Sequence, residues 1–133
     1  MEEIIAKLSA YMARMEEEAK EQYSFKDLTL TQMHYLEMIS ELENPNLTEL
    51  AAAMKLTKPT ITVLVDKLIE KELVYKVKSD ADRRSTHLHL TERGKLINQM
   101  HEYAHRRIVE QIGKKMDADE MAQLMALLEK IMN

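Results

Sequence analysis

The most restrictive feature of this sequence is a pair of predicted helices that follow each other closely: the cap of the second comes only three residues after the end of the first. Thr48 is placed to cap a short Ala-rich helix that runs to about Met54, and Thr57 is placed to cap a second helix, with Pro59 tolerated in its first turn. Two helices with so little chain between them must cross at a steep angle. On the second helix, helical spacing predicts one buried stripe made of Ile61, Leu64, Val65, Leu68 and Ile69. This spacing is that of a helix-turn-helix, with the second helix in the reading position.

A β-hairpin is predicted directly after the reading helix. The segment 74–78, Val-Tyr-Lys-Val-Lys, is β-prone, and residues 79–83 form a polar loop. The returning strand alternates between two faces, with Thr86, Leu88 and Leu90 on one and His87 and His89 on the other. We expect the two histidines on the exposed face of the hairpin. A helix-turn-helix followed by such a two-stranded wing is a winged helix.

Two helices are predicted before the helix-turn-helix. Apolar residues recur at helical spacing from 2 to about 23, which indicates one long amphipathic helix. Thr31 is placed to cap a second helix, and Asn44-Pro45-Asn46 ends it.

Two more helices follow the wing. Thr91 is placed to cap a long helix through about Ile112 that Gly113 can terminate, and Asp117 with Glu120 forms a capping-box pattern for the last helix. The predicted order is therefore α-α-α-α-β-β-α-α, a mainly α winged helix-turn-helix with flanking helices.

Length and composition restrict the class of protein. At 133 residues the chain is expected to form one domain, and without cysteine it has no disulfide or thiolate metal site. No apolar run reaches the length of a membrane span, and the acidic start differs from a basic secretory signal, so we expect a cytoplasmic protein with no membrane partner. No phosphate-binding glycine loop or nucleophile motif is present, so an enzyme is not expected.

The net charge of −4 hides an uneven distribution. From Lys55 to Lys95 there are ten basic and six acidic residues, a net charge of +4, whereas the rest has nine basic and seventeen acidic residues, a net charge of −8. A basic middle segment that contains the helix-turn-helix and the wing suits a polyanionic partner.

The apolar stripes of the terminal helices predict self-association. Ile4, Leu8 and Met12 at one end and Leu124, Leu128 and Ile131 at the other would otherwise leave large stripes exposed.

The chain resembles the MarR family of transcriptional regulators over nearly its whole length. The resemblance is carried by the helix-turn-helix segment 47–74, by Asp82-x-Arg84, and by Leu88-x-Leu90-Thr91-x-x-Gly94. It implies a single domain over 1–133, with a winged helix-turn-helix lobe at about 31–91 and dimerisation helices at about 2–23 and 92–132. Glu72 stands where many relatives have glycine before the wing, which makes the local turn geometry a point to examine.

The resemblance also implies a function and a mechanism. A homodimer would place its two reading helices in successive major grooves of a near-palindromic double-stranded DNA operator, acting as a repressor until a ligand fixes a spacing that DNA cannot accept. A helical scaffold that binds protein instead of DNA is an alternative, but it leaves the basic wing without a purpose.

Short polar and basic side chains are the candidates for DNA contact. Arg84 is similar to the wing arginine that enters a minor groove, with Asp82 holding the loop around it. Ordinary surface charges are the alternative interpretation of these residues. The candidate set is Thr57, Lys58, Thr60, Thr62, Lys67, Lys78, Asp82, Arg83 and Arg84.

Three histidines and one glutamate are candidate zinc ligands. His101 and His105 are four residues apart and share a helix face, and His34 lies on the second predicted helix. Zinc-sensing members of the family bind metal with residues at similar places, and Glu16 could supply an oxygen. Half-buried histidines that are satisfied by hydrogen bonds without metal are the alternative, which the sequence alone favours.

A different effector is suggested by a second likeness. The segments 25–39 and 82–97, together with His101-x-x-x-His105, also resemble the repressors of fatty-acid synthesis in Gram-positive bacteria, which respond to carrier-bound acyl chains. The eleven methionines would suit a flexible acyl chain, although methionine at helical spacing is usually core.

Overall fold

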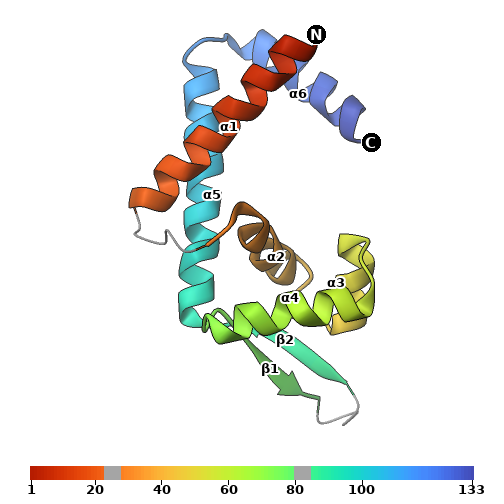
Figure 1. Cartoon of the computed structure of the whole chain (residues 1–133). Coiled ribbons are helices and arrows are strands. Elements are labelled where there is room, and N and C mark those ends of the chain that lie inside the picture. The colour runs from red at the N-terminus through yellow and green to blue at the C-terminus, as the bar shows by residue number, and fades with distance from the viewer. Residues whose placement is uncertain (23–27, 80–84) are drawn as a thin grey trace.

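The computed structural model describes residues 1–22, 28–79 and 85–133, which form a winged lobe and a helical body joined by one long helix (Figure 1). The order of elements is the predicted one. The elements are α1 (Glu2–Gln22), α2 (Leu30–Glu41), α3 (Leu47–Met54), α4 (Lys58–Glu70), β1 (Val74–Lys78), β2 (Thr86–Leu90), α5 (Glu92–Gly113) and α6 (Ala118–Met132).

The winged lobe contains the hydrophobic core. Leu36 and Ile39 of α2, Ile61 of α4 and Leu88 of β2 are fully buried in one cluster, and Ile97 brings the first part of α5 into it. The predicted stripe of α4 is confirmed, because its members are buried or packed against this cluster. The core therefore fixes α4 with one face inward and leaves the opposite face free.

The wing is an antiparallel hairpin in which Val74 pairs with Leu90 and Lys78 with Thr86. Leu88 and Leu90 face the core, as predicted. His87, however, is not simply an exposed residue. Its Nδ1 lies 3.0 Å from the carbonyl oxygen of Asn44, so the ring ties β2 to the turn after α2.

Two predicted helix caps are wrong by two residues. The cap of α2 is Thr29 and not Thr31, because Thr29 Oγ1 accepts from the backbone N–H of Gln32 while Gln32 Oε1 accepts from that of Thr29. The cap of α3 is Asn46 and not Thr48, because Asn46 forms the same reciprocal pair with Glu49. In both cases, the position that satisfies two backbone donors starts the helix.

The predicted caps Thr57, Thr91 and Asp117 are confirmed. Thr91 also joins the start of α5 to the turn between α4 and β1, because its hydroxyl donates to the carbonyl oxygen of Glu72 at 2.7 Å and its N–H donates to that of Leu73. Glu72, where glycine was expected in relatives, has a φ of 59°.

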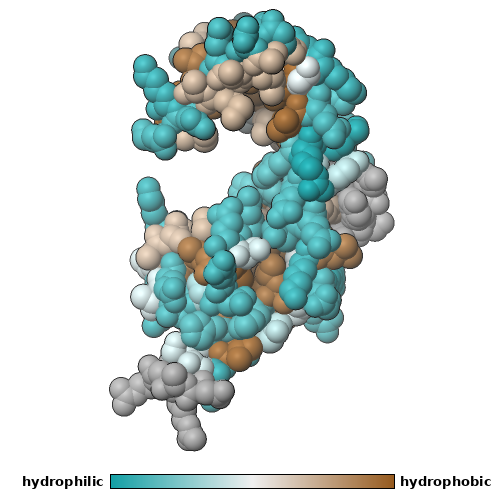
Figure 2. Space-filling model, turned by 180° about the vertical axis from the view of Figure 1, so that it is seen from behind, coloured by the Kyte–Doolittle hydropathy of each residue, from teal (hydrophilic) through white to brown (hydrophobic). Residues whose placement is uncertain are grey.

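The helical body is formed by α1, α6 and the second half of α5. α1 runs along α5, and α6 lies near the start of α1 (Figure 1). No residue of α6 is buried. Seen from behind, the molecule is notched between this body and the winged lobe (Figure 2).

Candidate DNA interface and metal site

The reading helix α4 presents its first turns to solvent. The predicted contact residues Thr57, Lys58, Thr60 and Lys67 are exposed, and Thr62 is half-buried. Because Ile61, Val65 and Leu68 hold the other face in the core, the N-terminal half of α4 is the part that is free to enter a groove.

The threonine hydroxyls at this helix start are already engaged. Thr57 Oγ1 accepts from the backbone N–H of Thr60 at 3.4 Å and lies 2.8 Å from Thr60 Oγ1. Thr62 Oγ1 donates to the carbonyl oxygen of Lys58 at 2.9 Å. These bonds position the helix start and reduce the number of hydroxyl protons that remain for a ligand.

The structure bears on only part of the predicted wing contacts. Lys78 is exposed at the end of β1. Asp82, Arg83 and Arg84 lie outside the described residues, so their role stays a prediction.

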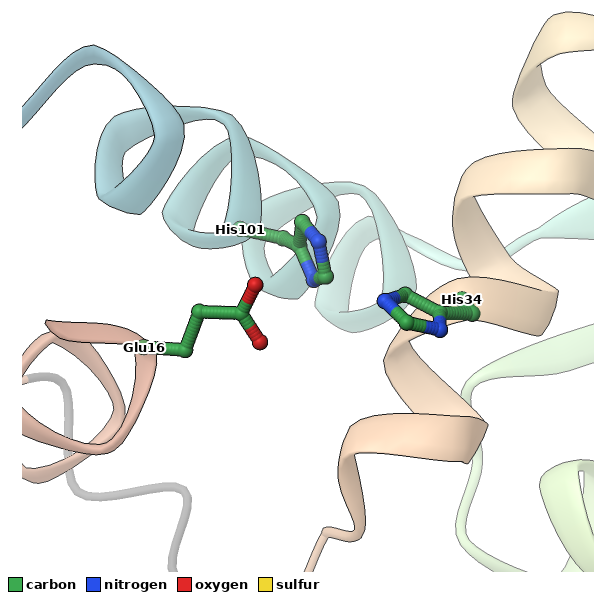
Figure 3. A group of neighbouring side chains, drawn as sticks. All are labelled: Glu16, His34 and His101. Carbon is green, nitrogen blue, oxygen red and sulfur yellow. The ribbon is translucent and has the colours of Figure 1, made fainter. Parts of the chain in front are cut away.

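Three of the four candidate metal ligands come together where the two parts of the molecule meet. One ligand atom of each of Glu16 (α1), His34 (α2) and His101 (α5) lies within 4.8 Å of the other two. Figure 3 shows the Glu16 carboxylate and the two imidazoles converging from three helices. The spacing of His101 and His105 is local to α5, but nothing local brings α1 or α2 to His101, so the grouping of Glu16, His34 and His101 is a product of the fold.

The group contains buried polar atoms without hydrogen-bond partners among the described residues. These atoms are Glu16 Oε2 and both ring nitrogens of His101, whose side chain is only 1% exposed. Among the described residues, His101 thus lacks the hydrogen bonds that the metal-free interpretation expects. An unsatisfied polar atom in a buried position is costly, and a bound cation would offset that cost.

His101 has the protonation state that a metal requires. Burial, together with the nearby His105, lowers the pKa of the His101 imidazole from 6.5 to about 4. The ring is consequently neutral at pH 7, with a lone pair on one nitrogen available for coordination.

His105 and Glu37 lie beside the three residues. His105 Nε2 is 3.7 Å from Glu16 Oε1, but it is not one of the mutually close ligand atoms. Glu37 Oε2 is 3.5 Å from His101 Nε2. The sequence analysis missed Glu37, although its place three residues after His34, on one face of α2, was a usable signal.

Two nitrogens and a carboxylate oxygen match the ligands that zinc and similar divalent ions take in proteins. At metal–ligand bonds of about 2.0–2.2 Å, tetrahedral ligands are roughly 3.3 Å apart. The three side chains would have to draw together by at most about 1.5 Å. His34 is exposed, so its side chain has room for this adjustment.

An apolar groove of about 390 Å³ lies in the helical body. It is formed between α1, α5 and α6, and its lining is Leu8, Met12, His105, Ile108, Val109, Ile112, Leu124 and Leu128. Ile4 of α1 and Ile131 of α6, each about one helical turn from the lining residues Leu8 and Leu128, are also exposed.

One hydrogen bond connects the start of α2 to the end of the reading helix. Lys71 Nζ, at the C-cap of α4, donates to Gln32 Oε1 at 2.9 Å. Gln32 is the capping-box residue of α2 and lies two residues before His34.

In the described part of the chain, no helix combines the length and apolar character needed to cross a membrane.

Comparison with known proteins gives one consistent result. A profile of the MarR family matches residues 28–86. The uncharacterized HTH-type transcriptional regulator YpoP of Bacillus subtilis is 30% identical over 104 residues, which cover 78% of this chain and 72% of YpoP. The described fold also superposes on FabT of Streptococcus pneumoniae in complex with DNA, with a TM-score of 0.85, 27% identity, and coverage of 98% of this chain and 90% of FabT. The apo form of wild-type MarR from E. coli gives a TM-score of 0.70 at 25% identity, with coverage of 100% and 97%.

Proposed function

Because the chain belongs to the MarR family of transcriptional regulators, we propose that it acts in the cytoplasm as a homodimeric repressor that binds a near-palindromic DNA operator under the control of a divalent metal ion. The observation that carries the DNA-binding part is the exposed N-terminal half of α4, held outward by a core on its other face. FabT, whose fold this chain shares at a TM-score of 0.85, has been solved with DNA.

The dimer is supported by the apolar surface of the helical body. α6 buries none of its residues, and Leu127, Ile131 and Met132 are at least 60% exposed. A second copy seated against α1, the end of α5 and α6 would cover this surface and the 390 Å³ groove. Two lobes would then be held at a fixed spacing, as a near-palindromic site requires.

Substitution of the predicted wing arginine tests DNA binding. In the dimer, Arg84→Ala removes two guanidinium groups from electronegative grooves, so it should weaken operator binding severely while leaving folding and dimerisation intact. It should also flatten the dependence of log affinity on log salt, by about one unit for each phosphate contact removed. Asp82→Ala should have a smaller effect, because Asp82 is proposed to orient the loop without touching DNA. Operator affinity of both variants is measured across a salt series, with sedimentation as the folding control. If Arg84→Ala binds like the parent at every salt concentration, a reading role for the wing is excluded.

The metal-dependent part rests on Glu16, His34 and His101. The unsatisfied atoms of Glu16 and His101 and the neutral state of His101 suit a cation with two imidazole ligands and one carboxylate ligand, such as zinc. The bound ion would supply positive charge that compensates Glu16 and would link three helices.

The position of the site supports a coupling between metal and DNA. α1 belongs to the helical body and α2 to the winged lobe, so an ion held by Glu16 and His34 would restrain one against the other. The Lys71–Gln32 hydrogen bond joins the start of α2 to the end of α4, so a shift of α2 on metal binding would reach α4 through it. If metal alters DNA affinity, DNA must alter metal affinity by the same factor.

Metal titration tests this coupling. Zinc should raise the melting temperature of the chelator-treated protein and change its operator affinity, whereas magnesium should do neither, because magnesium prefers oxygen ligands. His34→Ala should abolish both effects without unfolding the protein, since His34 is exposed. His89→Ala is the matched control, because it removes a histidine of the wing. Operator affinity that is the same with zinc and with a chelator would exclude metal control.

A further inference from the structure

The face of α4 that points away from the core is unusually apolar at its centre. Val63 is 55% exposed, the most exposed of the large hydrophobic side chains that the structure describes between Leu28 and Met100. Pro59 lies four residues before it on the same face and is also exposed. A β-branched valine on a solvated helix face contributes neither burial nor high helix propensity. A contact with a partner would give this side chain a role that it does not have within the lobe.

Hydrogen-bonding capacity at this place is small. Thr57, Thr60 and Thr62 together carry three hydroxyl protons, and two of these are used in the Thr57–Thr60 bond and the Thr62–Lys58 bond. Pro59 has no backbone N–H. The N-terminal half of the helix is therefore poorly equipped to read bases through hydrogen bonds alone.

Charge restricts which part of α4 can approach DNA. Asp66 and Glu70 are exposed on the C-terminal half, and Asp66 Oδ1 lies 3.9 Å from Lys76 Nζ. Lys67 lies between these carboxylates and offsets part of their charge. The N-terminal half carries Lys58 and the positive end of the helix dipole and has no carboxylate, so it is the half that phosphates favour. Pro59 and Val63 lie in the half that is favoured.

We propose that Val63, together with Pro59, is a specificity-determining apolar surface that reads the 5-methyl groups of thymines in the major groove. The thymine methyl is the one apolar group that a base pair displays there, and it is what an aliphatic side chain can distinguish. Each half-site of the operator therefore carries thymine at the base pairs under the first two turns of α4. This inference rests on the proposed DNA-binding function.

Removal of single methyl groups from the DNA tests the inference. A binding sequence is first selected from random duplexes with the full-length protein, and each thymine is then replaced by uracil, which lacks only the methyl group. Replacement of at least one thymine per half-site should weaken binding of the parent protein about fivefold, as expected for loss of one buried methyl contact.

Protein variants complete a double-mutant cycle. Val63→Ala should weaken binding to the thymine duplex by a similar factor but bind the uracil duplex as the parent does. Leu96→Ala, which truncates another exposed side chain of the lobe, is the matched control and should bind like the parent. Val63 is 55% exposed and is not part of the buried core cluster, so Val63→Ala should remain folded.

Three outcomes would overturn the inference. Uracil could be neutral at every position, which excludes methyl reading while leaving DNA binding intact. Val63→Ala could weaken both duplexes equally, which would assign Val63 to a contact with another group. If no duplex is enriched in the selection, the proposed DNA-binding function fails together with this inference.

Discussion

The winged lobe buries its apolar side chains within one chain, whereas the helical body leaves many of its apolar side chains exposed. The twelve largest fully buried hydrophobic side chains of the described structure all lie between Leu28 and Met100. In the helical body, by contrast, α6 buries no residue, and Ile4 and Ile131 are 66% and 78% exposed.

This difference shows which part of the molecule folds by its own contacts. The lobe closes its core within one chain, whereas the apolar stripes of α1 and α6 need a second surface. Glu16, His34 and His101 lie at the boundary between the two. The candidate metal site therefore lies where the lobe meets the part that needs a partner.

The largest effect is expected from a single methyl group at the base of the lobe. At position 94, a Cβ would collide with the carbonyl oxygen of Leu73, which is rigid backbone at the start of the wing. Gly94→Ala should therefore reduce the free energy of unfolding by about 4 kcal/mol, as in other severe backbone clashes. Urea unfolding monitored by circular dichroism measures this.

Gly113→Ala is the matched control in the helical body. No atom lies within 4 Å of a Cβ at position 113, and alanine favours helix by up to about 1 kcal/mol. It should be neutral or stabilising. Equal stability of the two variants would contradict the close packing of α5 on the wing.

Acid should destabilise the boundary between the regions through His101. Between pH 6.5 and 4 the unfolded state binds a proton at this imidazole, whereas the folded state, with its pKa lowered to about 4 by burial and His105, does not. The free energy of unfolding of the metal-free protein should therefore be complete above pH 6.5 and should fall toward pH 4, by at most about 3 kcal/mol from this residue.

The control replaces the titrating group by an apolar one of similar size. His101→Met should show a smaller decrease over the same pH range, measured by urea unfolding in the presence of a chelator. Parallel curves for the parent and this variant would show that His101 does not titrate as described.

A charge in the groove should separate association from folding. Leu128→Glu places a carboxylate in the apolar groove beside Ile108 and Leu124, so it should raise the dimer dissociation constant by about 100-fold or more while the lobe stays folded. Ala126→Glu adds the same charge on the opposite face of α6 and should leave the dimer unchanged. Sedimentation velocity compares the two, and a dimeric Leu128→Glu would remove the groove from the interface.

The smallest effect concerns backbone strain at the reading helix. Glu72 has a φ of 59°, a conformation that glycine adopts without a steric cost, so Glu72→Gly should be neutral or stabilise the lobe by up to about 1 kcal/mol. Glu70→Gly, two residues earlier within α4, should instead destabilise it by about 1 kcal/mol. Thermal melts of both variants test whether the turn conformation, and not the residue type, decides the sign.

The sequence by itself determined the elements and their inward faces. Hydrophobic periodicity and caps such as Thr57, Thr91 and Asp117 act over a few residues, so the order of helices and strands and the stripe of α4 could be predicted. The two wrong caps are also local matters. Gln32 follows Thr29 by three residues, and Glu49 follows Asn46 by three residues. Both are capping-box patterns that can be recognised in the sequence.

Only the tertiary structure decided which distant residues meet. Periodicity assigns a residue to a face of its own helix but does not give the crossing of α1, α2 and α5, and that crossing brings Glu16 and His34 to His101. The same reason applies to Glu37 beside His101 and to Gly94 against Leu73, because burial, unsatisfied nitrogens and steric contact arise from neighbours far along the chain. The candidate ligands were visible in the sequence as residue types, and their union into one site depended on how three helices pack.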